Sequence, residues 1–230
     1  LSPMFELIES GAVAFSDDGT VIKTAAVLRS VMEYSKMFDA PIIEHCEDDS
    51  LSDGAVNEGL TSTLLGLPAI PNVAEDLIVA RDIMMAEFIG ARIHIAHIST
   101  KGAVDLVRLA KKKGIKVTTE VTPHHFTLTD DNIKSFDTNY KMSPPLRTRT
   151  DIDAIIEGLK DGTIDVIASD HAPHSIEEKE MEFIYAPNGL VGLETTLGLV
   201  LSELVHKKHL TLEQAVEKLS INPRKILKIS

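Results

Sequence analysis

The sequence has little of what small secreted domains or nucleic-acid binders need. It has one cysteine, Cys46, among 230 residues, so an internal disulfide is excluded and a reducing, cytoplasmic setting is expected. Acidic residues outnumber basic ones by 35 to 23, and the formal net charge of −12 argues against a nucleic-acid partner, which would require a basic face. No run of about eighteen apolar residues occurs, so we expect no membrane-spanning helix.

Two kinds of segment alternate along the chain. Short runs rich in β-branched and apolar residues predict strands at residues 12–15, 41–44, 92–96, 115–121 and 164–168. Segments of helical period predict helices at residues 25–37, 73–89, 102–113, 150–159, 193–206 and 211–219. Nearly all-apolar strands are typical of parallel sheets that are covered on both faces. The pattern predicts an α/β protein in one domain.

Two parallel architectures compete, an open doubly wound sheet and a (β/α) barrel. A doubly wound sheet usually has a glycine-rich turn after its first strand, and neither G-x-G-x-x-G nor G-x-x-x-x-G-K-[ST] occurs in this chain. A barrel instead predicts functional side chains at the carboxyl ends of several strands. The sequence shows that second pattern.

Every expected strand is followed by carboxylates or imidazoles. They are Asp17 and Asp18, His45 and Glu47, His97, His124 and His125, and Asp170, His171 and His174. Each one alone fits a turn or a hydrogen-bonded structural residue. Together on one rim they favour a metal site, and Asp and His ligands suit Zn²⁺ with an open position for water.

Such a site hydrolyses or forms a polarised amide or ester bond, and needs a further carboxylate to move the proton. Asp170, after the last strand, is the natural candidate. A Ser-His-Asp triad is the rival mechanism, but no G-x-S-x-G motif is present. Cys46 is expected in the core, where free cysteines are usually found.

Eight segments together resemble class I dihydroorotases of the amidohydrolase superfamily. They are residues 14–19, 44–48, 65–71, 95–100, 120–125, 143–147, 167–174 and 192–195. They occur in the family's order over nearly the whole chain. The resemblance implies a (β/α)8 TIM barrel and the reversible, zinc-dependent hydrolysis of the cyclic amide of (S)-dihydroorotate to N-carbamoyl-L-aspartate, a step of de novo pyrimidine synthesis.

The resemblance also implies roles for individual residues. The implied ligands of one or two zinc ions are Asp18, His45, His97 and Asp170, and Asp170 is also the implied catalytic residue. The implied substrate contacts are Ser143, His174, Asn188 and Gly189. No ligand role falls to His124, His125 or His171, and the first two are expected to be structural.

Two positions refine the resemblance. At the first, Asp17-Asp18, hydantoinases, dihydropyrimidinases and allantoinases usually carry a carboxylated lysine, so the sequence favours dihydroorotase over these families. Ser143 stands where the class often has asparagine before Pro-Pro-Leu-Arg, so one hydrogen-bonding group of a two-point contact is lost.

The family's His-x-His-x-Arg motif, expected on a first strand, does not occur in this chain, which begins with Leu1. The five expected strands would then be the fourth to eighth of a barrel, and residues 1–230 one partial barrel domain, without the family's C-terminal β segment and of low activity alone. The open edge of the sheet favours self-association into a homo-oligomer, or association with a complementary fragment. The alternatives are a non-catalytic dihydroorotase-like structural partner of another enzyme, or a different cyclic amidohydrolase.

Overall fold

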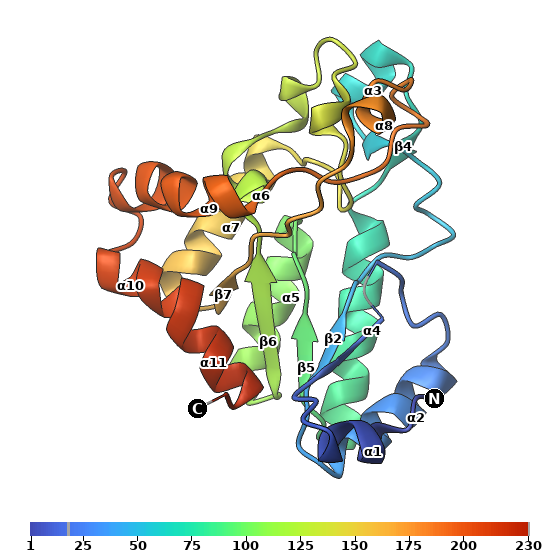
Figure 1. Cartoon of the computed structure of the whole chain (residues 1–230), viewed down its shortest axis with the longest axis vertical. Helices are drawn as coiled ribbons and strands as arrows, with labels where there is room; N and C mark the ends of the chain where they lie inside the picture. The colour runs from blue at the N-terminus through green and yellow to red at the C-terminus, as the bar shows by residue number, and fades with distance from the viewer. Residues whose placement is uncertain (18, 230) are drawn as a thin grey trace.

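The computed structural model describes residues 1–17 and 19–229, so Asp18 lies outside the described residues. A five-stranded sheet forms its centre, in the order β1-β2-β5-β6-β7 (Figure 1). The strands are β1 (Phe15–Ser16), β2 (Ile42–Glu44), β5 (Ile93–Ile95), β6 (Val117–Val121) and β7 (Val166–Ile167). All four neighbouring pairs are parallel, so the carboxyl ends of the strands lie at one edge.

The strand order follows the order along the chain, with no reversal among the described strands. A doubly wound sheet reverses its order at a switch point, so that alternative does not describe this sheet. The prediction of an α/β protein with a parallel sheet is confirmed. The observed strands are shorter than expected, and the first begins at Phe15 rather than at residue 12.

Four helices follow the strands in turn and pack side by side. They are α2 (Ala25–Lys36), α4 (Val73–Ile89), α5 (Lys101–Lys112) and α7 (Arg149–Asp161). Helix α4 contacts both α2 and α5, and α5 contacts α7. Thr24 and Thr100 cap α2 and α5 by accepting hydrogen bonds from Val27 and Ala103, as threonine does at a helix start. All four helices were expected within two residues at each end.

The C-terminal helices differ from the expectation in length. The predicted helix at 193–206 is α9 (Leu193–Leu199) continued by a π-helical turn, η3 (Val200–Val205). The predicted helix at 211–219 is α10 (Leu212–Val216), followed by a second π turn, η4 (Glu217–Ile221), and by α11 (Asn222–Leu227). Helix α11 continues η4 without a break, and Pro223 lies just after the π turn. The expected end of this helix at residue 219 was therefore wrong.

A layer of short elements, none of them predicted, covers the carboxyl ends of the sheet near the top of Figure 1. It contains α3 (Leu60–Leu65), α6 (Pro123–Thr127), α8 (Ile176–Lys179), the 3-10 turns η1 (Asp130–Asn132) and η2 (Thr138–Tyr140), and the parallel pair β3 (Val56–Asn57) and β4 (Ala69–Ile70). Helix α1 (Met4–Glu9) lies at the opposite end, beside the N-terminus. The upper layer gives the sheet edge its loops.

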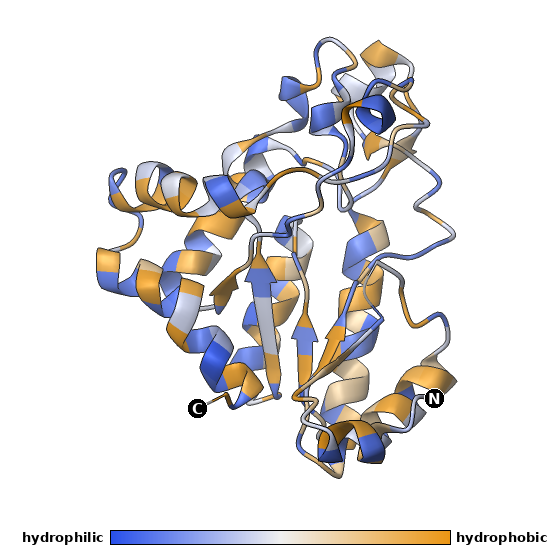
Figure 2. Ribbon diagram, viewed as in Figure 1, coloured by the Kyte–Doolittle hydropathy of each residue, from blue (hydrophilic) through white to orange (hydrophobic). Residues whose placement is uncertain are grey.

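The core lies between the sheet and its helices. Figure 2 shows apolar positions on the strands and on the helices beside them, together with polar positions such as those of β6. The largest fully buried side chains of the core include Leu28, Met32, Ile42, Ile93, Ile95 and Ile155. Cys46 is buried in the same cluster, which confirms its predicted core position. No helix in the described part of the chain is long and apolar enough to span a membrane.

One buried acid on α4 predicts a pH effect on stability. The Asp82 carboxylate accepts a hydrogen bond from Arg81 Nε at 2.7 Å, and Cys46 Sγ lies 3.5 Å from its other oxygen. Burial raises the pKa of Asp82 to about 6, although Arg81 opposes the shift. The folded protein therefore holds a proton that the unfolded chain releases near pH 4, and this term lowers wild-type stability as the pH rises from about 4 to about 6.

We expect Asp82→Asn to remove this term. Relative to wild type, the free energy of unfolding of the variant should rise by on the order of 2 kcal/mol between pH 4 and pH 7. Urea unfolding at a series of pH values measures the difference. Asp153→Asn, at a carboxylate with 61% side-chain exposure, is the control. Parallel curves for wild type and Asp82→Asn would contradict the prediction.

Candidate active site

A cleft of about 930 Å³ opens at the carboxyl ends of the central strands. Its walls come from the loops after β1, β2, β5 and β7 and from the loops of the upper layer. The lining residues are Gly19, His45, Glu47, Asp49, Ser50, Ser52, Asp53, His97, Ser143, Asp170, Ala172 and Asn188. Five of the predicted site residues therefore line one cleft: His45, His97, Ser143, Asp170 and Asn188.

Two imidazoles meet in this cleft. His45 follows β2, His97 follows β5, and these strands are hydrogen-bonded neighbours. His45 Nδ1 and His97 Nε2 are 3.1 Å apart, with the rings edge to face. Burial, and then the nearby His45, lower the pKa of His97. The His97 ring is therefore neutral at pH 7, the form in which histidine binds a metal.

Backbone conformation sets apart two residues of this cleft. His97 has a φ of 30° and Asp170 a φ of 46°, both in the left-handed region that non-glycine residues seldom adopt. Such strain persists only where the surrounding structure imposes it, and it clusters at functional sites. Here it turns the side chains that follow β5 and β7 into the same cleft.

Asp170 lies beside a histidine that carries no charge. Asp170 Oδ2 is 4.0 Å from His124 Nε2, and burial lowers the pKa of His124 to about 3. Neutral His124 therefore gives Asp170 a polar neighbour rather than an ion pair. The Asp170 side chain is 35% exposed, so it can reach a molecule in the cleft.

The histidines after β6 form a connected chain of hydrogen bonds. The carbonyl of Pro144 can only accept, so His125 Nε2 donates to it at 3.0 Å and His125 Nδ1 accepts from the Thr122 hydroxyl at 2.7 Å. The Thr122 oxygen in turn accepts from His124 Nε2 at 2.8 Å. Both histidines are buried and satisfied, in keeping with the expected structural role, and they hold the segment that carries Ser143.

His171 also has a structural contact. Its Nδ1 accepts hydrogen bonds from the backbone N–H groups of Gly192 and Leu193, at 3.1 and 3.2 Å. These contacts fix the start of α9 beside the end of β7. His171 therefore positions the backbone at the start of α9.

The other predicted substrate contacts lie at the cleft's rim. His174 Nε2 donates to the carbonyl of Asn188 at 2.8 Å, and only Asn188 of this pair lines the cleft. Gly189 has a φ of 126°, and a side chain there would meet the Ala172 carbonyl at 2.5 Å. The loop therefore requires glycine at this position, and His174 holds the loop from behind.

Glu47 also lines the cleft. The sequence places it after an expected strand but does not assign it an individual role. His45 Nε2 donates to Glu47 Oε2 at 3.4 Å, and the Ser143 hydroxyl donates to the same oxygen at 3.0 Å. Burial raises the pKa of Glu47, but the hydrogen bonds from His45 and Ser143 outweigh it and hold that pKa below its usual range. The spacing could have revealed this residue, because side chains two apart in an extended segment point the same way.

The donor set of the cleft fits a metal ion. Two nitrogens at about 2.0–2.1 Å from one tetrahedral zinc are about 3.3 Å apart, close to the observed separation of 3.1 Å between His45 Nδ1 and His97 Nε2. Among residues 1–17 and 19–229, no group of three potential ligands surrounds a common point. The predicted ligand Asp18 lies outside the described residues.

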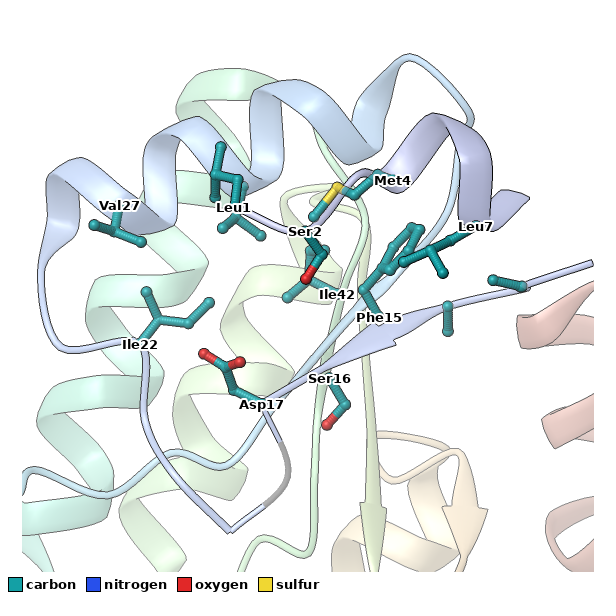
Figure 3. A pocket seen from close by; sticks show the side chains of 13 residues that line it. Leu1, Ser2, Met4, Leu7, Phe15, Ser16, Asp17, Ile22, Val27 and Ile42 are labelled. Carbon is teal, nitrogen blue, oxygen red and sulfur yellow. The ribbon is translucent and has the colours of Figure 1, made fainter. Parts of the chain in front are cut away.

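A second hollow, of about 690 Å³, lies between α1, β1 and α2 (Figure 3). Its lining is mainly apolar, with Met4, Leu7, Phe15 and Ile22 around it. Asp17 is its acidic member. Because it lacks a group of converging imidazoles and carboxylates, the polar cleft at the strand ends is the better candidate for chemistry.

Comparison with known proteins agrees with the geometry. A family model described as Dihydro-orotase-like matches residues 1–103. A dihydroorotase from Acetivibrio thermocellus is 54% identical over 231 residues, which include 100% of this chain and 54% of that protein. A dihydroorotase from Syntrophus aciditrophicus is also 54% identical, with the same coverage. The chain is similar along its whole length to proteins named dihydroorotase. It spans about half the length of these relatives.

Solved structures with the same fold include two proteins named hydantoinase. The L-hydantoinase from Arthrobacter aurescens superposes with a TM-score of 0.86 at 24% identity, over 98% of this chain and 53% of the other. A D-hydantoinase gives a TM-score of 0.83 at 21% identity, over 96% of this chain and 52% of the other. At this identity the likeness establishes the fold alone, whereas the dihydroorotase relatives match the sequence itself.

Proposed function

We propose that the protein is a dihydroorotase, which reversibly hydrolyses the ring amide of (S)-dihydroorotate to N-carbamoyl-L-aspartate in pyrimidine synthesis. The observation that carries the proposal is the pair of imidazole nitrogens 3.1 Å apart, in a cleft that also holds Asp170. Identity of 54% along the whole chain to proteins named dihydroorotase supports the choice of substrate.

The proposed zinc ligands are His45 and His97, together with Asp18 and Asp170. Bound zinc would polarise the ring carbonyl and lower the pKa of a bound water to about 7. His97 is neutral, and its Nε2 would bind the cation in the tautomer that carries the ring proton on Nδ1. The second oxygen of the Asp170 carboxylate keeps capacity for a proton.

Asp170 is the proposed acid and base. During hydrolysis its carboxylate accepts the proton of the attacking water and then delivers it to the ring nitrogen as the C–N bond breaks. In the reverse direction the same carboxyl exchanges the proton with the attacking ureido nitrogen. Asp170 lines the cleft, and its backbone adopts the left-handed conformation there.

Substrate recognition is proposed for the cleft's rim. The loop at Asn188 and Gly189 is proposed to face the pyrimidine ring, with Asn188 lining the cleft. His174, proposed to contact the substrate carboxylate, would have to exchange its hydrogen bond to the Asn188 carbonyl for that contact. Ser143 donates its hydroxyl proton to Glu47, so toward a substrate its oxygen acts as an acceptor, suited to a ring N–H.

The sheet also supports a proposal about the fold. Strands in sequential parallel order, with one helix after another beside them, are what a stretch of about five βα units of a (β/α)8 barrel would give. The superposition of this chain on about half of the L-hydantoinase, with a TM-score of 0.86, supports the proposal that the chain forms part of a larger fold of this kind.

The experiment that tests the function is a substrate comparison in a chimera. This chain replaces the 231 matched residues of the Acetivibrio thermocellus dihydroorotase, and the product is assayed with Zn²⁺ on dihydroorotate, hydantoin and allantoin. We expect kcat/KM for dihydroorotate to exceed that for the other rings by at least about 100-fold. The 230-residue chain, assayed beside it, should turn over dihydroorotate slowly.

Circular dichroism and zinc content show whether the chimera is folded and loaded. A folded, zinc-loaded chimera that prefers hydantoin would overturn the choice of substrate. One that hydrolyses none of the three rings would overturn the enzymatic proposal and favour a structural homologue.

A further inference from the structure

We propose that Glu47 is a positioning residue, which sets the tautomer of His45 and is itself oriented by Ser143. The inference rests on the proposed metal site. It concerns which nitrogen of His45 carries the proton, and therefore which nitrogen can bind a cation.

The hydrogen bonds define the tautomer. A carboxylate only accepts, so the His45 nitrogen that faces it, Nε2, must carry the proton. His45 Nδ1 is then a lone pair directed at His97. Metal-binding histidines commonly donate their second nitrogen to a carboxylate, which fixes the ring and increases its basicity.

The adjacent histidine completes the pattern. Because His45 Nδ1 accepts, His97 Nε2 donates across the 3.1 Å contact, which leaves His97 Nδ1 unprotonated. His97 Nδ1 is buried and has no hydrogen-bond partner among the described residues. An unprotonated nitrogen there avoids a buried N–H without an acceptor, so this arrangement of protons leaves a lone pair, rather than an N–H group, without a partner.

Ser143 holds Glu47 in place. Its hydroxyl donates to Glu47 Oε2, the oxygen that also receives His45. The segment of Ser143 is anchored by the hydrogen bond from buried His125 to Pro144. Ser143, which stands where the class often has asparagine, therefore reaches and orients the Glu47 carboxylate, although the two residues are 96 positions apart in the sequence.

Two readouts test the proposal on the 230-residue chain. In the metal-free protein, ¹⁵N NMR of the imidazole nitrogens reports the tautomer of His45. Competition with a chromophoric chelator gives the affinity for Zn²⁺, and the visible spectrum of bound Co²⁺ reports ligand geometry. The variants are Glu47→Gln, Glu47→Ala and Ser143→Ala, with exposed Glu87→Gln as the matched control.

We expect Glu47→Gln to weaken Zn²⁺ binding by about 10-fold and Glu47→Ala by up to about 100-fold. Ser143→Ala should weaken Zn²⁺ binding less than either of these substitutions. His45 should change from the Nε2–H form to a mixture in Glu47→Ala, while Glu87→Gln behaves as wild type. Unchanged affinity and an unchanged tautomer in a folded Glu47→Ala protein would overturn the proposal. A wild-type chain that binds no Zn²⁺ would overturn the proposed metal site instead, and the tautomer measurement would still decide the role of Glu47.

Discussion

Asp170→Asn should lower kcat for dihydroorotate hydrolysis by about 10²–10⁴-fold, the usual contribution of general acid–base catalysis. Asparagine keeps the size of the side chain and one carbonyl oxygen, but it cannot accept and return a proton at the reacting nitrogen. The substitution is made in the chimera with the Acetivibrio thermocellus enzyme. Steady-state kinetics at saturating Zn²⁺ measure the loss.

Because Asp170 is also a proposed ligand, zinc content and KM must be measured with kcat. We expect the Asn variant to retain metal when Zn²⁺ is in excess and to lose mainly kcat. Asp153→Asn, at a carboxylate with 61% side-chain exposure on α7, serves as the control for the substitution itself. Near-wild-type turnover by a zinc-loaded Asp170→Asn protein would remove Asp170 from its proposed role.

The sequence predicted the parts of this molecule that depend on local periodicity. The central strands and α2, α4, α5 and α7 bury a regular stripe or run of apolar residues, so their existence can be read without knowledge of their neighbours. The residues after parallel strands share one edge, and this is why His45, His97 and Asp170 could be assigned to one cleft before the structure was known.

The remaining features depend on contacts between residues far apart in the chain. Strands β3 and β4 have only two residues each, too few to show a period, and polar contacts from elsewhere hold them. The contact between Glu47 and Ser143 joins two loops, so the sequence around either residue does not predict it. The π turns after Leu199 and Val216 lie within segments whose apolar pattern predicts continuous helices.

Arg147 illustrates such a long-range contact and carries the largest expected effect on stability. The resemblance placed it beside Ser143 in one motif, yet its side chain is buried beneath the upper layer. Its Nη1 donates to the Asn57 side chain and to the Ile70 carbonyl, both at 3.0 Å, so it ties β3 and β4 together. Its Nη2 lies 3.7 Å from buried Glu75.

We expect Arg147→Ala to lower the free energy of unfolding by about 3–5 kcal/mol, because it leaves the Glu75 carboxylate buried without its cation. Burial already raises the pKa of Glu75, and Arg147 opposes that shift. In the variant the folded protein therefore holds a proton on Glu75 that the unfolded chain releases near its ordinary pKa. The cost of the substitution should consequently be larger at pH 8 than at pH 5.

Urea unfolding at both pH values measures this cost, with Arg149→Ala as the matched control. The Arg149 side chain is 71% exposed and pairs with Asp153 at 2.9 Å, so its loss should change stability by less than about 1 kcal/mol. Adding Glu75→Gln to Arg147→Ala should recover part of the stability and flatten the pH dependence, because the uncompensated charge is then gone. Equal effects of Arg147→Ala and Arg149→Ala would mean that water or a rearranged side chain satisfies Glu75. In that case the upper layer, and the cleft it covers, would depend on apolar packing rather than on this arginine.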